Sequence, residues 1–233
     1  MLQLNRQPQP EYLPQPQSKP AADEYARRVD YFLKHTAALR GQVETQRRLS
    51  PDQEAVLNGL AERLCIDPSP DANYRIFREL WAAENNEQVY LETVETSHPH
   101  LSGEQCCFSE PAVWRQPHPH NSGASLLRFS MAFPLTKLAS YRIGSLKPRH
   151  RTFEGTREMA MGTLHITELK LFFYSETHST SLTFNGIVNV ECYSNGIEVG
   201  KANGRTEFFQ MTTLASQYAY MIIQELNRLI PSL

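Results

Sequence analysis

Three cations in the sequence fall at alternate positions. Residues 146–151 read LKPRHR, so one residue separates Lys147 from Arg149 and another separates Arg149 from Arg151. If this segment is extended, all three side chains point to the same face, because strand side chains alternate between faces. Ammonium and guanidinium groups placed in this way bind phosphate through charge-assisted and bidentate hydrogen bonds. The triplet is therefore a candidate anion site.

The surrounding sequence is also basic. Residues 133–157 contain six cations and one acid, Glu154, which gives a net charge of +5 in a chain whose net charge is −2. Pro148 favours an edge strand or a loop over a central strand. Exposed cations also keep edge strands soluble, so a solvated or salt-bridging face remains the alternative. The predicted anion-binding residues are Lys137, Arg142, Lys147, Arg149, Arg151 and Arg157.

Histidine and cysteine residues raise the question of a metal. The triplets His-Pro-His at 98–100 and 118–120 lie on either side of Cys106 and Cys107. These are good zinc ligands, but their spacing matches no zinc finger or ribbon. We therefore predict no metal site and no cofactor.

A catalytic interpretation has little sequence support. Glu168-x-Lys170, with Glu154 or Glu158 upstream, is weakly similar to the core of a restriction-type nuclease, but no neighbouring strand supplies an evident second acid. Nucleophile-elbow, phosphate-loop, zinc-protease and dinucleotide motifs are absent from the sequence. We predict that the protein is not an enzyme.

Composition is that of an ordinary folded domain. The chain has 233 residues, 40% of them apolar and 21% charged, which suggests one large domain or two small ones. The four cysteines form no CxxC pair, and no segment resembles a signal peptide or a membrane helix of about 20 apolar residues. We expect a cytoplasmic protein, with peripheral membrane attachment through the basic segment as an extension of that expectation.

The sequence divides into three parts. Residues 1–20 contain five prolines and five glutamines and are predicted to form an extended arm. Residues 21–86 are predicted to form a helical module of three helices. In the first helix, apolar and small residues recur at spacings of three and four. Ser50-Pro51-Asp52-Gln53 is typical of a helix start, and Val56, Leu57, Leu60 and Leu64 are the expected buried face of the second helix. In the third helix, Tyr74, Phe77, Leu80 and Trp81 are expected to point inward.

Residues 87–233 change to a strand pattern. Segments rich in Val, Ile, Phe, Tyr and Thr alternate with turns, and Asn-Gly pairs occur at 185–186, 195–196 and 203–204. Asn-Gly favours type I′ hairpin turns, so we predict an antiparallel meander that curls into a barrel or two orthogonal sheets. A final amphipathic helix, capped by Thr212 or Thr213, would cover an open end. The predicted fold class is α+β, with an N-terminal helical module followed by an antiparallel β-barrel and a C-terminal capping helix.

The amino-acid sequence of this region resembles the bacterial pleckstrin-homology-like domain. The resemblance covers roughly residues 80–230 and rests on GTLHITELKLFF and on the run that ends YSNGIEV. Asn195 replaces a usual aspartate, and Glu168-Leu169-Lys170 replaces a more basic turn. The matching residues are Gly162, Thr163, Leu164, Ile166, Thr167, Leu171, Phe173, Tyr193, Ser194, Gly196, Ile197 and Glu198.

The resemblance implies a binding scaffold. Pleckstrin-homology-like folds bind phosphoinositides, peptides or other domains, and a fold alone does not fix a function. Our hypothesis is a non-enzymatic adaptor or sensor that recruits a protein partner or forms a homo-oligomer, in a bacterial stress or anti-phage system. The rival is a peripheral binder of anionic groups through residues 137–157. Membrane lipid ranks above nucleic acid as its ligand, because few aromatic residues lie beside the cations.

Overall fold

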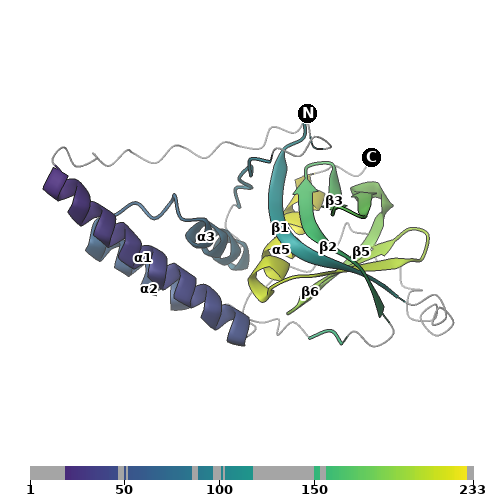
Figure 1. The fold of residues 1–233 in the computed structure, drawn as a ribbon, viewed down its shortest axis with the longest axis horizontal. Helices are drawn as coiled ribbons and strands as arrows, with labels where there is room; N and C mark the ends of the chain where they lie inside the picture. The colour runs from purple at the N-terminus through teal and green to yellow at the C-terminus, as the bar shows by residue number, and fades with distance from the viewer. Residues whose placement is uncertain are drawn as a thin grey trace. The chain divides into compact units, whose positions relative to one another are not determined.

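Figure 1 shows the fold in a computed structural model of the chain, which separates into two compact units with a division between Tyr90 and Leu91. The residues that the structure describes are 19–46, 50, 52–85, 89–96, 101, 103–117, 150–152 and 156–229.

The first unit is built from three helices, α1 (Lys19–Gln46), α2 (Asp52–Leu64) and α3 (Ala72–Glu84). The predicted inward residues of α3 are all buried, with Phe77 and Leu80 fully inaccessible to solvent. In α1 the apolar stripe is buried from Phe32 to Val43. One expectation is wrong. Val56 is 65% exposed, whereas Leu57 and Leu60 are buried as predicted and Ala61 completes the buried face of α2.

The predicted helix start at Ser50 and the observed start of α3 both have capping contacts. The backbone N–H of Ser50 donates to Gln53 Oε1 at 3.0 Å, which is the return bond of a capping box. Asp71 caps α3, and its carboxylate accepts from the backbone N–H of Tyr74 at 2.6 Å. The helical module therefore follows from local signals and an apolar stripe.

The second unit contains a seven-stranded antiparallel sheet. Its order is β4-β3-β2-β1-β7-β6-β5, so strands consecutive in the chain are neighbours except for β4 and β5, and β7 returns to pair with β1. Among the described residues the sheet is not closed, because β4 and β5 end the strand order without pairing to each other. The α+β class is confirmed, whereas the strands of the predicted barrel form, among the described residues, a sheet that is not closed. The strands are β1 (Cys106–Pro117), β2 (Thr156–Thr167), β3 (Lys170–Tyr174), β4 (Ser179–Thr183), β5 (Ile187–Tyr193), β6 (Gly196–Lys201) and β7 (Thr206–Gln210).

The inner face of the sheet is aromatic and aliphatic. The Trp114 and Phe173 rings lie 5.8 Å apart between centroids, and Phe173 lies 6.0 Å from Phe209. Helix α5 (Thr213–Leu229) packs on β5, β6, β1 and β2, and Figure 1 shows it against the sheet. Thr212 caps this helix, because its hydroxyl accepts from the backbone N–H of Ala215 at 3.4 Å. Each large side chain buried here contributes roughly 1.5–3 kcal/mol through the hydrophobic effect. None of the described helices has the length and hydropathy needed to cross a membrane.

The Asn-Gly hairpins exist, but their turn type differs from the prediction. Asn195 and Asn203 do not have positive φ, whereas Gly204 has φ +78°. Gly204 N–H donates to Lys201 O at 2.9 Å, which is a type I turn followed by a left-handed glycine. Asn185-Gly186 lies in a short 3-10 helix, η3 (Phe184–Gly186), between β4 and β5. SLLRFSMAF at 125–133, one of the segments whose composition predicts a strand, lies outside the described residues.

Gly196 starts β6 at a position that no larger residue can occupy. Its φ is +153°, and a Cβ there would lie 2.3 Å from the Phe209 carbonyl oxygen. We predict that Gly196→Ala lowers the free energy of unfolding by about 2–4 kcal/mol, through backbone strain and overpacking. Chemical denaturation measures this. Gly200→Ala on the same strand is the control, because its nearest contacts are at 3.6 Å and only a small change is expected. Equal losses in both variants would contradict the steric explanation.

Candidate functional site

The structure describes two of the six predicted anion-binding residues. Lys137, Arg142, Lys147 and Arg149 lie outside the described residues, so their arrangement remains a prediction. Arg157 is exposed on β2, and Arg151 lies in the short described segment 150–152. The two described cations have different surroundings, because Arg151 contacts the sheet closely.

Arg151 is held on the outer face of β5, β6 and β7. Its guanidinium forms an ion pair with Glu198 of β6. The same group lies 5.4 Å from the ring centroid of Tyr193 and 5.3 Å from that of Phe208, which is cation–π distance. Only 24% of the Arg151 side chain is exposed. Its charge is already matched by a carboxylate and two aromatic faces.

The backbone of Arg151 is held as well. Arg151 N–H donates to Asn195 Oδ1 at 2.9 Å, and Asn195 Nδ2 donates to Arg151 O at 3.0 Å. The Asn195 amide thus bonds both backbone groups of one residue, as a neighbouring strand would. Arg151 therefore attaches the chain before β2 to the β5–β6 turn. The sequence predicts an anion as the partner of Arg151 and does not indicate Glu198, although the run YSNGIE contains both Asn195 and Glu198.

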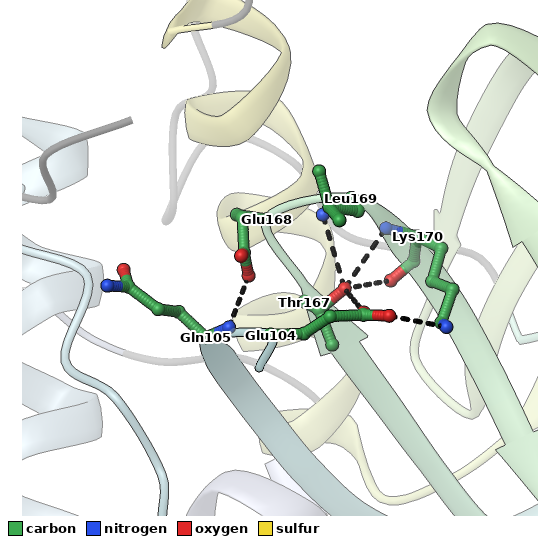
Figure 2. A network of polar contacts seen from close by, with 6 residues as sticks. All are labelled: Glu104, Gln105, Thr167, Glu168, Leu169 and Lys170. Carbon is green, nitrogen blue, oxygen red and sulfur yellow. Dashed lines mark hydrogen bonds and ion pairs between the residues drawn. The ribbon is translucent and has the colours of Figure 1, made fainter. Parts of the chain in front are cut away.

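A second polar network surrounds Thr167 at the turn from β2 to β3 (Figure 2). Thr167 is fully buried, and its hydroxyl donates to Glu104 Oε2 at 2.7 Å. The same oxygen accepts from the backbone N–H groups of Leu169 and Lys170 at 3.2 and 3.1 Å. Lys170 Nζ forms an ion pair with Glu104 Oε1 at 2.6 Å. The network joins the residues before β1 to the far end of β2.

This network bears on the nuclease alternative. The Glu168 carboxylate accepts from the backbone N–H of Gln105 at 2.5 Å, and the Lys170 ammonium is paired with Glu104. Glu158 pairs with Arg115 at 2.9 Å near the other end of β2. Each of these three side chains therefore has a structural partner. In the described ranges no cluster of three His, Cys, Asp or Glu residues could hold a metal ion. The two His-Pro-His triplets lie outside those ranges.

The thiols of the three cysteines in the second unit have low reactivity. Cys106 and Cys107 are buried, and the Cys106 thiol donates to Phe108 O at 3.0 Å. Burial raises the pKa of the Cys106 thiol, and it raises the pKa of the Cys107 and Cys192 thiols to about 12. These thiols are protonated at neutral pH and are therefore poor nucleophiles and poor metal ligands.

The two edges of the sheet present backbone groups that could pair with another chain. In the part of the chain that the structure describes, no strand pairs with the outer side of β4 or of β5. The edges differ in regularity and in charge. β4 pairs with β3 without a register shift and carries only Ser, Thr and Leu. β5 has a bulge between Ile187 and Asn189, and its regular part carries Glu191 at the centre.

Glu191 is exposed but has a defined orientation. Tyr193 donates its hydroxyl to Glu191 Oε2 at 2.8 Å, and Asn189 Nδ2 donates to Oε1 at 3.2 Å. Burial first, and then the neighbouring Glu191, raise the pKa of Tyr193, so its hydroxyl remains a donor at neutral pH. Val188 is 44% exposed on the same strand. The β5 edge thus combines open backbone groups with a fixed negative charge and an apolar side chain.

Comparison with known proteins identifies no family. No protein family matches the chain, and no curated protein matches it. Among solved structures, the C-terminal domain of an unknown protein from Leishmania infantum is similar over 56% of this chain and 90% of that chain, with 19% identity and a TM-score of 0.32. A similarity at this level shows neither a family nor a function.

Thr167 gives a test of the network in Figure 2. Thr167→Val keeps the shape of the side chain but removes the hydroxyl that donates to Glu104 and accepts from two backbone N–H groups. We expect a loss of about 1–3 kcal/mol in unfolding free energy, since buried partners would be left unsatisfied. Thr163→Val on the same strand is the matched control and should change stability by less than about 0.5 kcal/mol. Unchanged stability of the Thr167 variant would show that the network is only a surface contact.

Thiol labelling tests the cysteine environments. At pH 8 the exposed Cys65 should react rapidly with iodoacetamide. Cys107 and Cys192, whose pKa is about 12, should react roughly 1,000-fold more slowly than an unperturbed thiol until the protein is denatured. Mass spectrometry of native and denatured samples measures the difference. Rapid native labelling of Cys107 would contradict its burial.

Proposed function

We propose that this protein is a non-enzymatic interaction module that recruits a protein partner by adding an extended segment of that partner to the β5 edge. The observation that carries the proposal is the β5 edge, where no described strand pairs with backbone groups that lie beside an oriented carboxylate. Strand addition of this kind draws affinity from main-chain hydrogen bonds and specificity from alternate side chains. Seven antiparallel strands followed by one helix also support a pleckstrin-homology-like plan, which we propose for this unit.

The register of the β5–β6 hairpin indicates which backbone groups face outward. Tyr193 is the partner of Gly196 across a two-residue loop, and such a loop closes on a hydrogen-bonded pair. Hydrogen-bonded pairs alternate along an antiparallel ladder, so Glu191 also bonds to β6. Val190 and Cys192 then turn their N–H and C=O groups to the open edge. An incoming strand would form its ladder with these two residues.

Glu191 suggests the chemistry of the partner. Its carboxylate lies on the outer face at the centre of the regular part of β5, where the side chain of an added strand would lie beside it. A lysine or arginine at that place would gain a cross-strand pair, whereas an acid would be repelled. Since Tyr193 and Asn189 already orient the carboxylate, little further ordering is needed on binding. We therefore expect a partner segment that is extended and basic at its centre.

Selection from a displayed library of short extended peptides tests this proposal. We expect selected sequences with Lys or Arg between β-branched or apolar residues, and we expect binding to slow hydrogen exchange at the Val190 and Cys192 amides. Glu191→Lys should weaken binding of these peptides by about tenfold and should select acidic peptides instead. The matched control is Glu176→Lys, which makes the same charge change at an exposed residue outside the strands and should leave selection unchanged.

Two results would reject the proposal. One is a library from which no peptide binds the folded protein. The other is a set of binders that protect amides away from β5 or keep their charge preference in the Glu191 variant. Binders of this second kind whose affinity depends on the charges of Lys137, Arg142, Lys147 and Arg149 would favour the anion-binding alternative.

A further inference from the structure

Strand β4 lacks, in the part of the chain that the structure describes, the features that usually protect an edge strand. Natural edges carry lysine, proline, a bulge or an inward-pointing charge, or they are covered. Strand β4 reads STSLT and pairs with β3 in unbroken register from Lys170↔Thr183 to Tyr174↔Ser179. It has no charge, no proline and no bulge. A regular, neutral edge of this kind is a template for another strand.

The turn before β4 shows which residues offer their backbone. The N–H of Ser175 donates to His178 O at 2.9 Å, so these two residues begin the β3–β4 ladder as a bonded pair. Hydrogen-bonded pairs recur at every second position, so the backbone N–H and C=O groups of Thr180 and Leu182 bond to β3. Ser179, Ser181 and Thr183 then direct their N–H and C=O groups to the open side. All three are exposed, while Leu182 is buried toward the core.

The occupant that best fits this edge is a second copy of the same strand. A two-fold antiparallel pair centred on Ser181 places Ser181 opposite its own copy and Ser179 opposite Thr183. These are the residues whose backbone groups face outward, so about six hydrogen bonds form without a change in either sheet. A two-fold axis places the central residue against itself, and a charged residue there would repel its copy. Ser181 carries no charge, and Ser and Thr pairs are favourable across strands.

The β5 edge shows the opposite case. In its regular part, residues 189–193, the central residue is Glu191, and two-fold pairing would bring two carboxylates together. The bulge at Ile187 also shortens the stretch that can pair. The same sheet thus has one edge that disfavours its own copy and one edge that accepts it.

We propose that two copies of this chain associate through their β4 edges and join their sheets into one continuous antiparallel sheet. A single five-residue strand buries much less than the roughly 1,200 Å² of a stable interface, so the dimer is weak, with a dissociation constant of about 10 μM to 1 mM. The dimer would carry two β5 edges, which would raise the avidity for a partner that contains two extended segments. The β4 contact itself does not depend on the function proposed for β5.

A charge-swap experiment tests the contact and its register. Sedimentation velocity of the full chain over a concentration series should show a monomer–dimer equilibrium. Ser181→Lys and Ser181→Glu should each shift the equilibrium at least about tenfold toward monomer, because each places like charges together on the axis. An equimolar mixture of the two variants should regain dimer at or above the wild-type level. Circular dichroism and thermal melting establish that each variant is folded, which Ser181 permits because it is exposed.

The control and the contrary outcomes are equally specific. Gln42→Lys adds the same charge at an exposed position of α1 and should leave the dimer unchanged. Wild-type protein that stays monomeric to about 1 mM would overturn the proposal. So would a dimer that persists in both Ser181 variants, or a mixture that fails to regain it. Peptide selection on the monomeric Ser181 variants should still succeed, so failure of the dimer and failure of the β5 proposal are separable.

Discussion

The double pairing of β1 is the constraint on which the rest of the sheet unit depends. One side of β1 pairs with β2 along almost its whole length, and the other side pairs with β7 through residues 113–115. Among the described strands, it is the β1–β7 pairing that connects the ladder of β1–β2–β3–β4 to the ladder of β5–β6–β7. Because β1 joins both halves from the inside, the outer strands of the described sheet are β4 and β5, which follow one another in the chain. The open edges are therefore a consequence of the strand order.

Buried polar side chains hold the ends of these strands in place where backbone hydrogen bonds between strands do not reach. The Thr167 hydroxyl accepts hydrogen bonds from two backbone N–H groups at the β2–β3 turn and donates one to Glu104, which precedes β1. At the β5–β6 turn the Asn195 side-chain amide forms hydrogen bonds with both the backbone N–H and the backbone C=O of Arg151. In each case a segment distant in sequence is attached to a turn, so the turn residues are constrained by more than turn propensity. Such networks are costly when only partly satisfied, which favours one arrangement of the chain over slipped registers.

The features that could be predicted from sequence are those that local rules govern. The stripe of α1, the capping box at Ser50 and the β5–β6 and β6–β7 hairpins follow from periodicity, capping chemistry and turn residues. Val56 was misplaced because a helix of 13 residues allows several apolar faces, and tertiary packing selects among them. The turn type was wrong because Gly204 alone supplies the positive φ, so the preceding asparagine need not. The ion pair of Arg151 with Glu198 joins residues 47 positions apart, and no periodic pattern encodes such a partner. The openness of the sheet likewise depends on long-range pairing, which strand propensity does not determine.

The contrast between the two edges carries an argument about how one sheet can avoid uncontrolled association. An edge strand that pairs with any other strand is an aggregation hazard, and charge is the usual remedy. Here Glu191 removes β5 from symmetric pairing while leaving it open to a basic strand, and the bulge beside Val188 limits its length. On β4 the protection is of a different kind. In the dimer proposed above, two-fold pairing would occupy both β4 edges at once, so the assembly would close at two copies and would not propagate. The edges left open among the described strands of that dimer would be the two that carry Glu191.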